Sequence, residues 1–198
     1  MIKKELRAWK TISRKTILRH SKFLTVESHA IQLPDGQILP DWPWLIVPDA
    51  AIVLARTEDQ KFLCFRQTKY AVEGSTLAPV GGMLEPGETG LQAAKRELLE
   101  EMGYTASEWV DLGGFILDPN RGIAKMYLFL ALNAQPVTQP DSDDLEDQEL
   151  LMLNRDELEQ ALKKGEFKII TWSAVVAMAL LTLDALENHE EIKREGKD

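Results

Sequence analysis

The 198-residue sequence predicts an α+β protein in which a small N-terminal β-meander precedes a larger layered domain. Strand-like runs open the chain, helical apolar stripes appear later, and the two kinds of segment mix without the regular alternation of βαβ units. A chain of this length buries one sizeable core, with room for a small extra subdomain. We therefore expect an α+β or layered α/β/α arrangement, divided into residues 1–47 and 48–198.

The N-terminal subdomain is predicted from short runs that alternate apolar and polar residues and are rich in β-formers. Residues 16–18 and 23–32 are such runs. Residues 34–36 (Pro-Asp-Gly) form a turn signal, after which residues 37–47 resume an extended pattern. These features predict a β-meander.

The larger domain combines strand-like runs with helical stripes. The strand-like runs are residues 50–55, 62–67, 110–117, 124–132 and 150–153, and the later helical stripes are residues 156–164 and 171–186. Residues 135–149 read as a polar, acidic loop, and the charged residues 188–198 are expected to fray.

A further helix is predicted after a long loop that contains glycine and proline. Thr89 and Gln92 have the spacing of a capping box, and Gly103 is placed to end the helix. An apolar stripe at helical spacing lies between them: Leu91, Ala94, Leu98 and Met102.

Three carboxylates lie on one face of this predicted helix. Glu97, Glu100 and Glu101 are at positions i, i+3 and i+4, so they fall within about one turn. Glu100 and Glu101 come just before the C-terminal end, where the helix dipole disfavours anions by roughly 0.3–1 kcal/mol each. This unfavourable placement indicates a bound cation, for which Mg²⁺ is the usual choice beside phosphates. The alternative is a solvated acidic helix.

The segment that carries these carboxylates resembles the Nudix hydrolase signature, G-x5-E-x7-R-E-U-x-E-E-x-G-U, in which U is a bulky aliphatic residue. The matching positions are Gly82, Glu88, Arg96, Glu97, Leu98, Glu100, Glu101 and Gly103. Only the last position departs from the signature, with Tyr104 in place of an aliphatic residue. The resemblance implies a Nudix α/β/α sandwich with a mixed sheet.

Other features resemble the ADP-ribose pyrophosphatase branch of this family. The N-terminal β-rich subdomain is one, the run of residues 66–69 (Arg-Gln-Thr-Lys) is another, and Pro119, sixteen positions after Gly103, is a third. The resemblance also implies a homodimer in which the N-terminal subdomains take part.

The resemblance further implies the roles of the helix residues. Glu97, Glu100 and Glu101 are expected to bind Mg²⁺, for which Mn²⁺ can substitute, together with the carbonyl oxygen of Gly81. Such a cation neutralises phosphate charge and lowers the pKa of bound water. Arg96 is expected to pair with Glu88 or with a ligand carboxylate, and otherwise to form a surface ion pair.

Two further roles come from the same resemblance. The general base is expected in the acidic loop, with Glu146 as the preferred residue, unless that whole loop is a solvated charge run. Arg66 and Lys69 are candidates for contacts with the phosphates or the ribose, or else are exposed strand charges.

The aromatic residues of the N-terminal subdomain leave two interpretations open. Trp42 and Trp44, with Trp9 and Phe23, can stack on a nucleobase or can fill a subdomain or dimer core. The three histidines show no ligand spacing, which favours surface or hydrogen-bonded core positions.

Composition restricts the partners and the compartment. A net charge of −9 argues against nucleic acid as the main partner. The single cysteine, Cys64, excludes an intrachain disulfide, which fits a reducing compartment. No signal peptide is apparent, and the longest apolar stretch, residues 169–183, is expected to be too short to span a bilayer. We therefore expect a cytoplasmic protein that does not enter membranes.

Three functions compete at this point. The first is Mg²⁺-dependent hydrolysis of ADP-ribose, a nucleotide sugar, to AMP and ribose 5-phosphate. The second is the same reaction on another nucleotide sugar, such as GDP-mannose. The third is a Nudix module that binds a nucleotide without chemistry, which the intact glutamates argue against.

Overall fold

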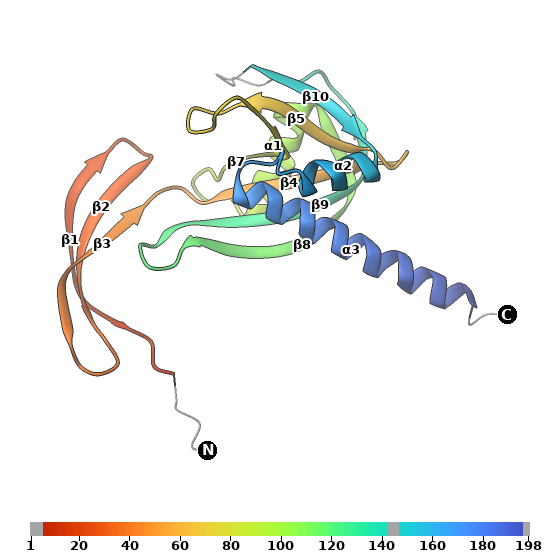
Figure 1. The fold of residues 1–198 in the computed structure, drawn as a ribbon. Coiled ribbons are helices and arrows are strands. Elements are labelled where there is room, and N and C mark those ends of the chain that lie inside the picture. Colours follow the sequence, from red (N-terminus) through yellow and green to blue (C-terminus); the bar gives the residue numbers. More distant parts are fainter. Residues whose placement is uncertain (1–5, 142–146, 196–198) are drawn as a thin grey trace. The chain divides into compact units, whose positions relative to one another are not determined.

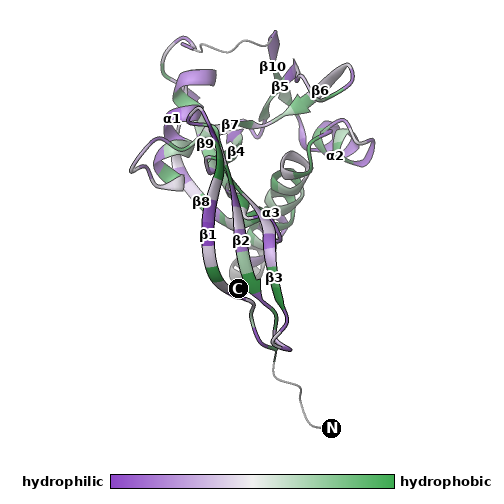
Figure 2. Ribbon diagram, turned by 90° about the vertical axis from the view of Figure 1, so that its left-hand side faces the viewer, coloured by the Kyte–Doolittle hydropathy of each residue, from purple (hydrophilic) through white to green (hydrophobic). Residues whose placement is uncertain are grey.

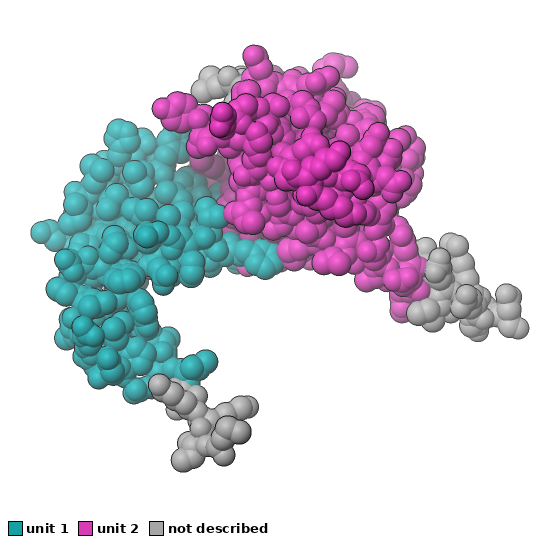
Figure 3. All heavy atoms as spheres, viewed as in Figure 1, with its two compact units in different colours: residues 1–49, 115–125 teal, residues 50–114, 126–198 magenta. Residues whose placement is uncertain are grey.

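The computed structural model describes residues 6–141 and 147–195, with side chains as far as His189. The chain divides into two compact units (Figure 3). The first contains the residues up to 49 together with 115–125, and the second contains residues 50–114 and those from 126 onward. The linear division predicted after residue 47 did not anticipate that residues 115–125 belong with the N-terminal unit.

The first unit contains a three-stranded antiparallel sheet in the order β1-β2-β3 (Figure 1). Its strands are β1 (Lys10–His20), β2 (Leu24–Gln32) and β3 (Ile38–Ile46). The sequence predicted only residues 16–18 of β1. Register shifts near Thr11 and near Thr16 break the alternation of side chains between the two faces, and this conceals a strand from period-two patterns.

Residues 118–122 form a turn that packs on β3 within the same unit. The Leu45 N–H donates to the Arg121 carbonyl at 2.8 Å, and the Trp42 Nε1–H donates to the Asn120 carbonyl at 2.7 Å. Gly122 has a φ of 69° and lies directly against the Trp44 ring. A side chain at this position would be strained and would collide with the indole.

The second unit contains a seven-stranded mixed sheet. The central order is β10-β5-β4-β9-β8, with β6 added to β5 and β7 added to β4. The strands β4 and β9 are parallel, whereas β4 pairs with β5 and β7 in antiparallel fashion. The bounds are β4 (Ala50–Thr57), β5 (Phe62–Thr68), β6 (Ser75–Ala78), β7 (Val80–Met83), β8 (Tyr104–Asp118), β9 (Ile123–Pro136) and β10 (Gln148–Leu153). The short strand β7 falls in the segment predicted as loop, and β6 was not predicted.

Helices cover both faces of this sheet. Helix α1 (Gly90–Met102) packs in one buried cluster through Ala93, Ala94, Leu98 and Met102. Helices α2 (Arg155–Lys163) and α3 (Ile170–Glu195) pack in the other cluster. The predicted α+β class and the α/β/α sandwich with a mixed sheet are confirmed. Leu91, predicted in the apolar stripe of α1, is instead exposed, and Ala93 is buried in its place.

Helix α3 differs from the prediction in two respects. It continues to Glu195, so residues 188–195 are helical and not frayed. By length and composition, Ile170–His189 is also long and apolar enough to cross a membrane, so the argument from a short stretch was wrong. Its inner residues Val175, Val176 and Leu183 are buried against the sheet, which is the position of a core helix.

Candidate active site

Both ends of α1 have the predicted caps. The Thr89 hydroxyl accepts from the Gln92 N–H at 3.3 Å, and the Gln92 Oε1 accepts from the Thr89 N–H at 2.8 Å. Gly103 has a φ of 73°, and its N–H reaches the Leu98 and Leu99 carbonyls. The capping box and the glycine cap are therefore confirmed, and they determine which residues fall in the last turn.

Two glycines of β7 permit close contacts, Gly81 with β4 and Gly82 with α1. Gly81 faces the backbone of Ala51 and Ile52 on β4, where a Cβ atom would overlap the Ala51 carbonyl. A Cβ atom at Gly82 would overlap the Glu97 carboxylate. The Glu97 side chain therefore lies directly against the backbone of Gly82, and Glu97 is only 7% exposed.

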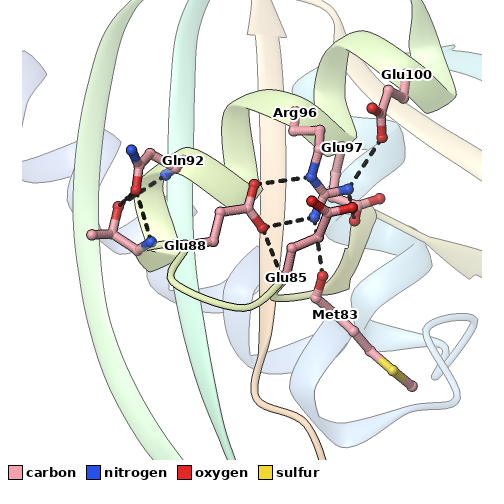
Figure 4. Close-up of polar contacts among 8 residues, drawn as sticks. Met83, Glu85, Glu88, Gln92, Arg96, Glu97 and Glu100 are labelled. Atoms are coloured by element: carbon pink, nitrogen blue, oxygen red, sulfur yellow. Dashed lines mark hydrogen bonds and ion pairs between the residues drawn. The ribbon is translucent and has the colours of Figure 1, made fainter. Parts of the chain in front are cut away.

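Arg96 joins the loop before α1 to the carboxylates of α1 (Figure 4). Its Nε and Nη2 donate to Glu88 Oε1 and Oε2 at 2.9 and 3.0 Å. Its Nη1 donates to Glu97 Oε1 at 2.7 Å and to Glu100 Oε2 at 3.1 Å. Its Nη2 also reaches the Met83 carbonyl at 3.0 Å. One guanidinium thus holds three carboxylates and the end of β7, and this includes the predicted pairing with Glu88.

The environment of Glu97 is unfavourable for an anion. Burial raises the pKa of Glu97, and the adjacent Arg96 opposes this shift only in part. A side-chain hydrogen bond with Glu101 also lowers the pKa of Glu97, by less than burial raises it. The negative charge of Glu100 also raises the pKa of Glu97, so a cation beside this cluster would favour the ionised form of Glu97.

The donor set fits a hard divalent cation. Carboxylate oxygens of Glu97, Glu100 and Glu101, with a backbone carbonyl of β7 beside them, are the ligand types that Mg²⁺ and Ca²⁺ prefer. Among residues 6–141 and 147–189, no three acidic, His or Cys side chains converge closely enough to hold a metal as they stand. The Arg96 guanidinium instead lies between Glu97 and Glu100 and supplies the positive charge there.

Arg66 is not brought together with these glutamates. It lies opposite Leu77 in the sheet and lines a cavity of about 440 Å³ with residues of α2. Its Nη2 pairs with Glu166 Oε2 at 3.2 Å. Because α1 and α2 cover opposite faces of the sheet, Arg66 and Glu97 lie on different sides. Lys69 follows β5 and is partly buried, and Glu146 lies outside the described residues.

Trp42 and Trp44 line a cavity of about 310 Å³ within the first unit. Trp9 lies edge-on to Trp42 with ring centroids 5.4 Å apart, and His29 stacks on Trp44 at 5.1 Å. Pro119 lines the same cavity. The rings therefore take part in packing, as one interpretation of the sequence required, and they also border an open space.

His29 and Asn120 are additional residues of this cavity that were not predicted there. His29 is buried, and its Nε2 lies 2.9 Å from Glu27 Oε2. The alternation along β2, which puts His29 and Ile31 on one face, could have indicated the position of His29. Nothing local relates Asn120 to β3.

Comparison with known proteins agrees with this geometry. A family model described as "NUDIX domain" matches residues 46–173. The chain belongs to the Nudix family. A second model, described as "Nucleoside diphosphate sugar hydrolase N-terminal domain", matches residues 9–45 of this Nudix hydrolase.

Two relatives and one solved structure extend the comparison. An ADP-ribose pyrophosphatase of Bacillus subtilis (strain 168) is 28% identical over 182 residues, which cover 90% of this chain and 96% of the relative. A methanol dehydrogenase activator of Bacillus methanolicus is also 28% identical over 182 residues, which cover 91% of this chain and 96% of the relative. A crystal structure of an ADP compounds hydrolase superposes with a TM-score of 0.79 at 21% identity, covering 92% of this chain and 98% of that one. Nudix hydrolases generally use divalent cations, in agreement with the donor set.

The pairing of Glu88 with Arg96 predicts a pH-dependent stability in this Nudix hydrolase. The hydrogen bonds from Arg96 lower the pKa of Glu88 below its ordinary value of 4.5. A carboxyl group whose pKa is lower in the folded state contributes stability above its unfolded pKa, and this stability is lost as the pH falls through the folded pKa. We expect Glu88→Gln to lower the free energy of unfolding by about 1–2 kcal/mol at pH 7.

The difference between the two proteins should then shrink as the pH falls below the ordinary Glu pKa. Urea unfolding of wild type and variant between neutral and acidic pH measures it. Glu108→Gln, an exposed change on β8, is the matched control and should stay near wild type. A Glu88→Gln deficit that is constant across this range would contradict the ion pair.

Proposed function

We propose that this Nudix hydrolase cleaves the pyrophosphate bond of ADP-ribose in a Mg²⁺-dependent reaction that yields AMP and ribose 5-phosphate. The observation that carries the proposal is the buried Glu97 carboxylate against Gly82, with Glu100 and Glu101 in the next turn of the same helix, an acidic group that a cation would neutralise. Two curated relatives bear names of ADP-compound hydrolases, ADP-ribose pyrophosphatase and ADP compounds hydrolase NudE, which is 26% identical over 132 residues.

The proposal gives each group of the site a task. Mg²⁺ held by Glu97, Glu100, Glu101 and the Gly81 carbonyl would neutralise phosphate charge and lower the pKa of an attacking water. Gly82 lets the Glu97 carboxylate approach the sheet, and Arg96 holds the loop before α1 against the carboxylates.

Three assignments in the proposal concern the substrate and the proton. Glu146 is the proposed general base, and Lys69 and Arg66 remain the proposed cationic contacts for phosphate or ribose. Arg66 now forms an ion pair with Glu166 on the face of the sheet opposite α1, and this ion pair would first have to break.

The adenine is proposed to bind in the cavity lined by Trp42, Trp44 and Pro119. The Trp42 Nε1–H is already used by the Asn120 carbonyl, so the indole offers its face and not its donor. Stacking on such a face tolerates different bases, and discrimination between adenine and guanine therefore depends on other hydrogen bonds.

Substrate preference is the direct test of this function. We expect kcat/KM with Mg²⁺ to be higher for ADP-ribose than for GDP-mannose, NADH, diadenosine polyphosphates or dGTP. The reason is that the N-terminal segment matches a nucleoside diphosphate sugar hydrolase domain, while one relative is named as an ADP-ribose pyrophosphatase. A competitor that exceeds ADP-ribose by about tenfold would reject the substrate but leave the chemistry intact.

Hydrolysis of another nucleotide sugar is the second candidate. It is favoured by the description of the matched N-terminal model, which names nucleoside diphosphate sugars in general. If none of the compounds is cleaved with Mg²⁺ or Mn²⁺, a non-catalytic nucleotide-binding module becomes the better interpretation.

A homodimer is also proposed, with the N-terminal sheet at its interface. Strand β1 is exposed along its whole length and includes the apolar residues Ile12, Ile17 and Leu18. Residues 6–22 contain six basic and no acidic side chains, in a chain of net charge −9. Figure 2 shows hydrophilic and hydrophobic stretches along β1. Among the described residues, none of the five basic side chains from Arg7 to Arg19 has an ion-pair partner. A second acidic copy complements such a strand in both charge and apolar surface.

Light scattering at micromolar concentration should therefore give about twice the 22.4 kDa chain mass. The dimer should weaken as salt is raised, because exposed charge pairs are screened. A strict monomer at micromolar concentration that still hydrolyses ADP-ribose efficiently would refute the dimer. We also propose a cytoplasmic location, because the single cysteine, Cys64, is a free thiol that cannot form an intrachain disulfide.

A further inference from the structure

The residues that follow β9 dock on the C-terminal end of α1. The Val137 and Thr138 N–H groups donate to the Gly103 carbonyl at 2.9 and 3.2 Å. Three residues later, the Asp141 N–H donates to the Glu100 carbonyl at 2.8 Å. We call residues 137–141 the α1 clamp.

Gly103 is shaped for this docking as well as for ending the helix. A Cβ atom at Gly103 would overlap the Thr138 carbonyl, so the clamp lies in direct contact with the backbone there. Glycine was expected at this position because of its positive φ, but the close approach of residue 138 is a second, independent reason for it.

The clamp acts where α1 is least stable. The last carbonyl groups of a helix have no partner within it, and the helix end carries a partial negative charge. Glu100 and Glu101 add two anionic side chains to this turn. The Asp141 N–H donates to the Glu100 carbonyl, which has no partner within the helix. The positive end of this N–H dipole also offsets part of the negative charge at the C-terminal end of α1.

We propose that the α1 clamp is a positioning element for the carboxylates of α1, and that it acts through the backbone N–H of Asp141 and not through the Asp141 carboxylate. Without this hydrogen bond the last turn frays, and Glu100 and Glu101 lose their alignment with Glu97 and Gly81. The inference rests on the proposed cation site for its consequence, but the clamp itself is a property of the metal-free protein.

Two variants of one residue separate the backbone from the side chain. Asp141→Pro removes the N–H, whereas Asp141→Ala keeps the N–H and removes the carboxylate. The preceding residue, Pro140, already restricts the chain here, and Asp141 is exposed, so neither change disturbs the core.

Hydrogen exchange of the metal-free protein is the first measurement. In the wild type, the Asp141 amide should be protected to about the same degree as the Gly103 amide, since both are hydrogen-bonded to the same turn. In Asp141→Pro, the amides of Glu101, Met102 and Gly103 should exchange at least about tenfold faster, and in Asp141→Ala they should stay within about twofold of wild type. A wild-type Asp141 amide that exchanges as fast as an unprotected one overturns the proposal without any variant.

Binding of Mn²⁺, followed by electron paramagnetic resonance, is the second measurement. The apparent dissociation constant should rise about tenfold in Asp141→Pro and stay within about twofold in Asp141→Ala. Equal losses in both variants would assign the role to the carboxylate and overturn the proposal. If the wild type cleaves none of the nucleotide compounds, the proposed function fails, whereas the exchange result still decides whether the clamp exists.

Discussion

Glu101→Gln is expected to lower kcat for ADP-ribose by at least about 100-fold, because charge stabilisation by a bound cation supplies several kcal/mol. The change removes one anionic ligand and keeps the size of the side chain. It also removes one negative charge from a row of three carboxylates, and the new amide can still donate a hydrogen bond to the buried Glu97. The metal-free variant should therefore be as stable as wild type or slightly more stable, which separates lost chemistry from lost folding.

The experiment compares steady-state kinetics with thermal unfolding in excess EDTA. Glu108→Gln makes the same chemical change at an exposed site and should retain wild-type turnover. Wild-type activity should disappear in EDTA and return with Mg²⁺ or Mn²⁺. Normal turnover in Glu101→Gln, or full activity of the wild type in EDTA, would reject the cation site on α1.

Arg96→Met should destabilise the metal-free protein more than any other single change in the site. Arg96 holds Glu88 through two parallel hydrogen bonds and lies between Glu97 and Glu100. The side chains of Glu88 and Glu97 are 16% and 10% exposed, so removal of their partner leaves two poorly solvated charges. We expect a loss of about 2–4 kcal/mol, below the full range for a deeply buried pair because Arg96 is 22% exposed.

For a chain of this size that loss corresponds to a fall in Tm of roughly 5–10 °C. Arg96→Lys should fall between Met and wild type, because lysine keeps the charge but not the two-pronged geometry. Lys95→Met removes one positive charge at the neighbouring, exposed position of α1, where the Lys95 Nζ lies 5.8 Å from the centre of the Trp109 ring. This change should alter stability by less than about 1 kcal/mol.

Divalent cations give Arg96→Met a second readout. Without the guanidinium, Glu88, Glu97 and Glu100 lose the positive charge that they share, so Mn²⁺ should raise the Tm of the variant more than that of wild type. Equal Tm values for Arg96→Met and Lys95→Met would show that the ion pairs around Arg96 contribute little.

Local spacing was sufficient wherever the partners are close in sequence. The capping box of Thr89 and Gln92, the cap at Gly103 and the common face of Glu97, Glu100 and Glu101 all depend on residues within one helical turn or one helix. Such i, i+3 and i+4 relationships are set by helix geometry, so the sequence already determined α1 and its row of carboxylates. The longer strands of the mixed sheet were predicted for the same reason, from their own apolar runs.

Segments whose pattern is interrupted or short were missed. Two register shifts conceal most of β1, and β6 and β7 have four residues each. In both cases the strand forms because a neighbouring strand supplies its hydrogen bonds. The local sequence does not show which segment that neighbour is.

The arrangement of the site depends on contacts between distant parts of the chain. Only the folded structure shows that Arg66 lies on the α2 side of the sheet, that residues 118–122 pack on Trp42 and Trp44, and that Asp141 holds the end of α1. Each of these contacts forms between residues about 40 or more positions apart, across a sheet or at the end of a helix. Sheet order and strand register decide these contacts, and both are properties of the assembled core. The carboxylate row of α1, in contrast, depends only on the spacing of residues within one helix.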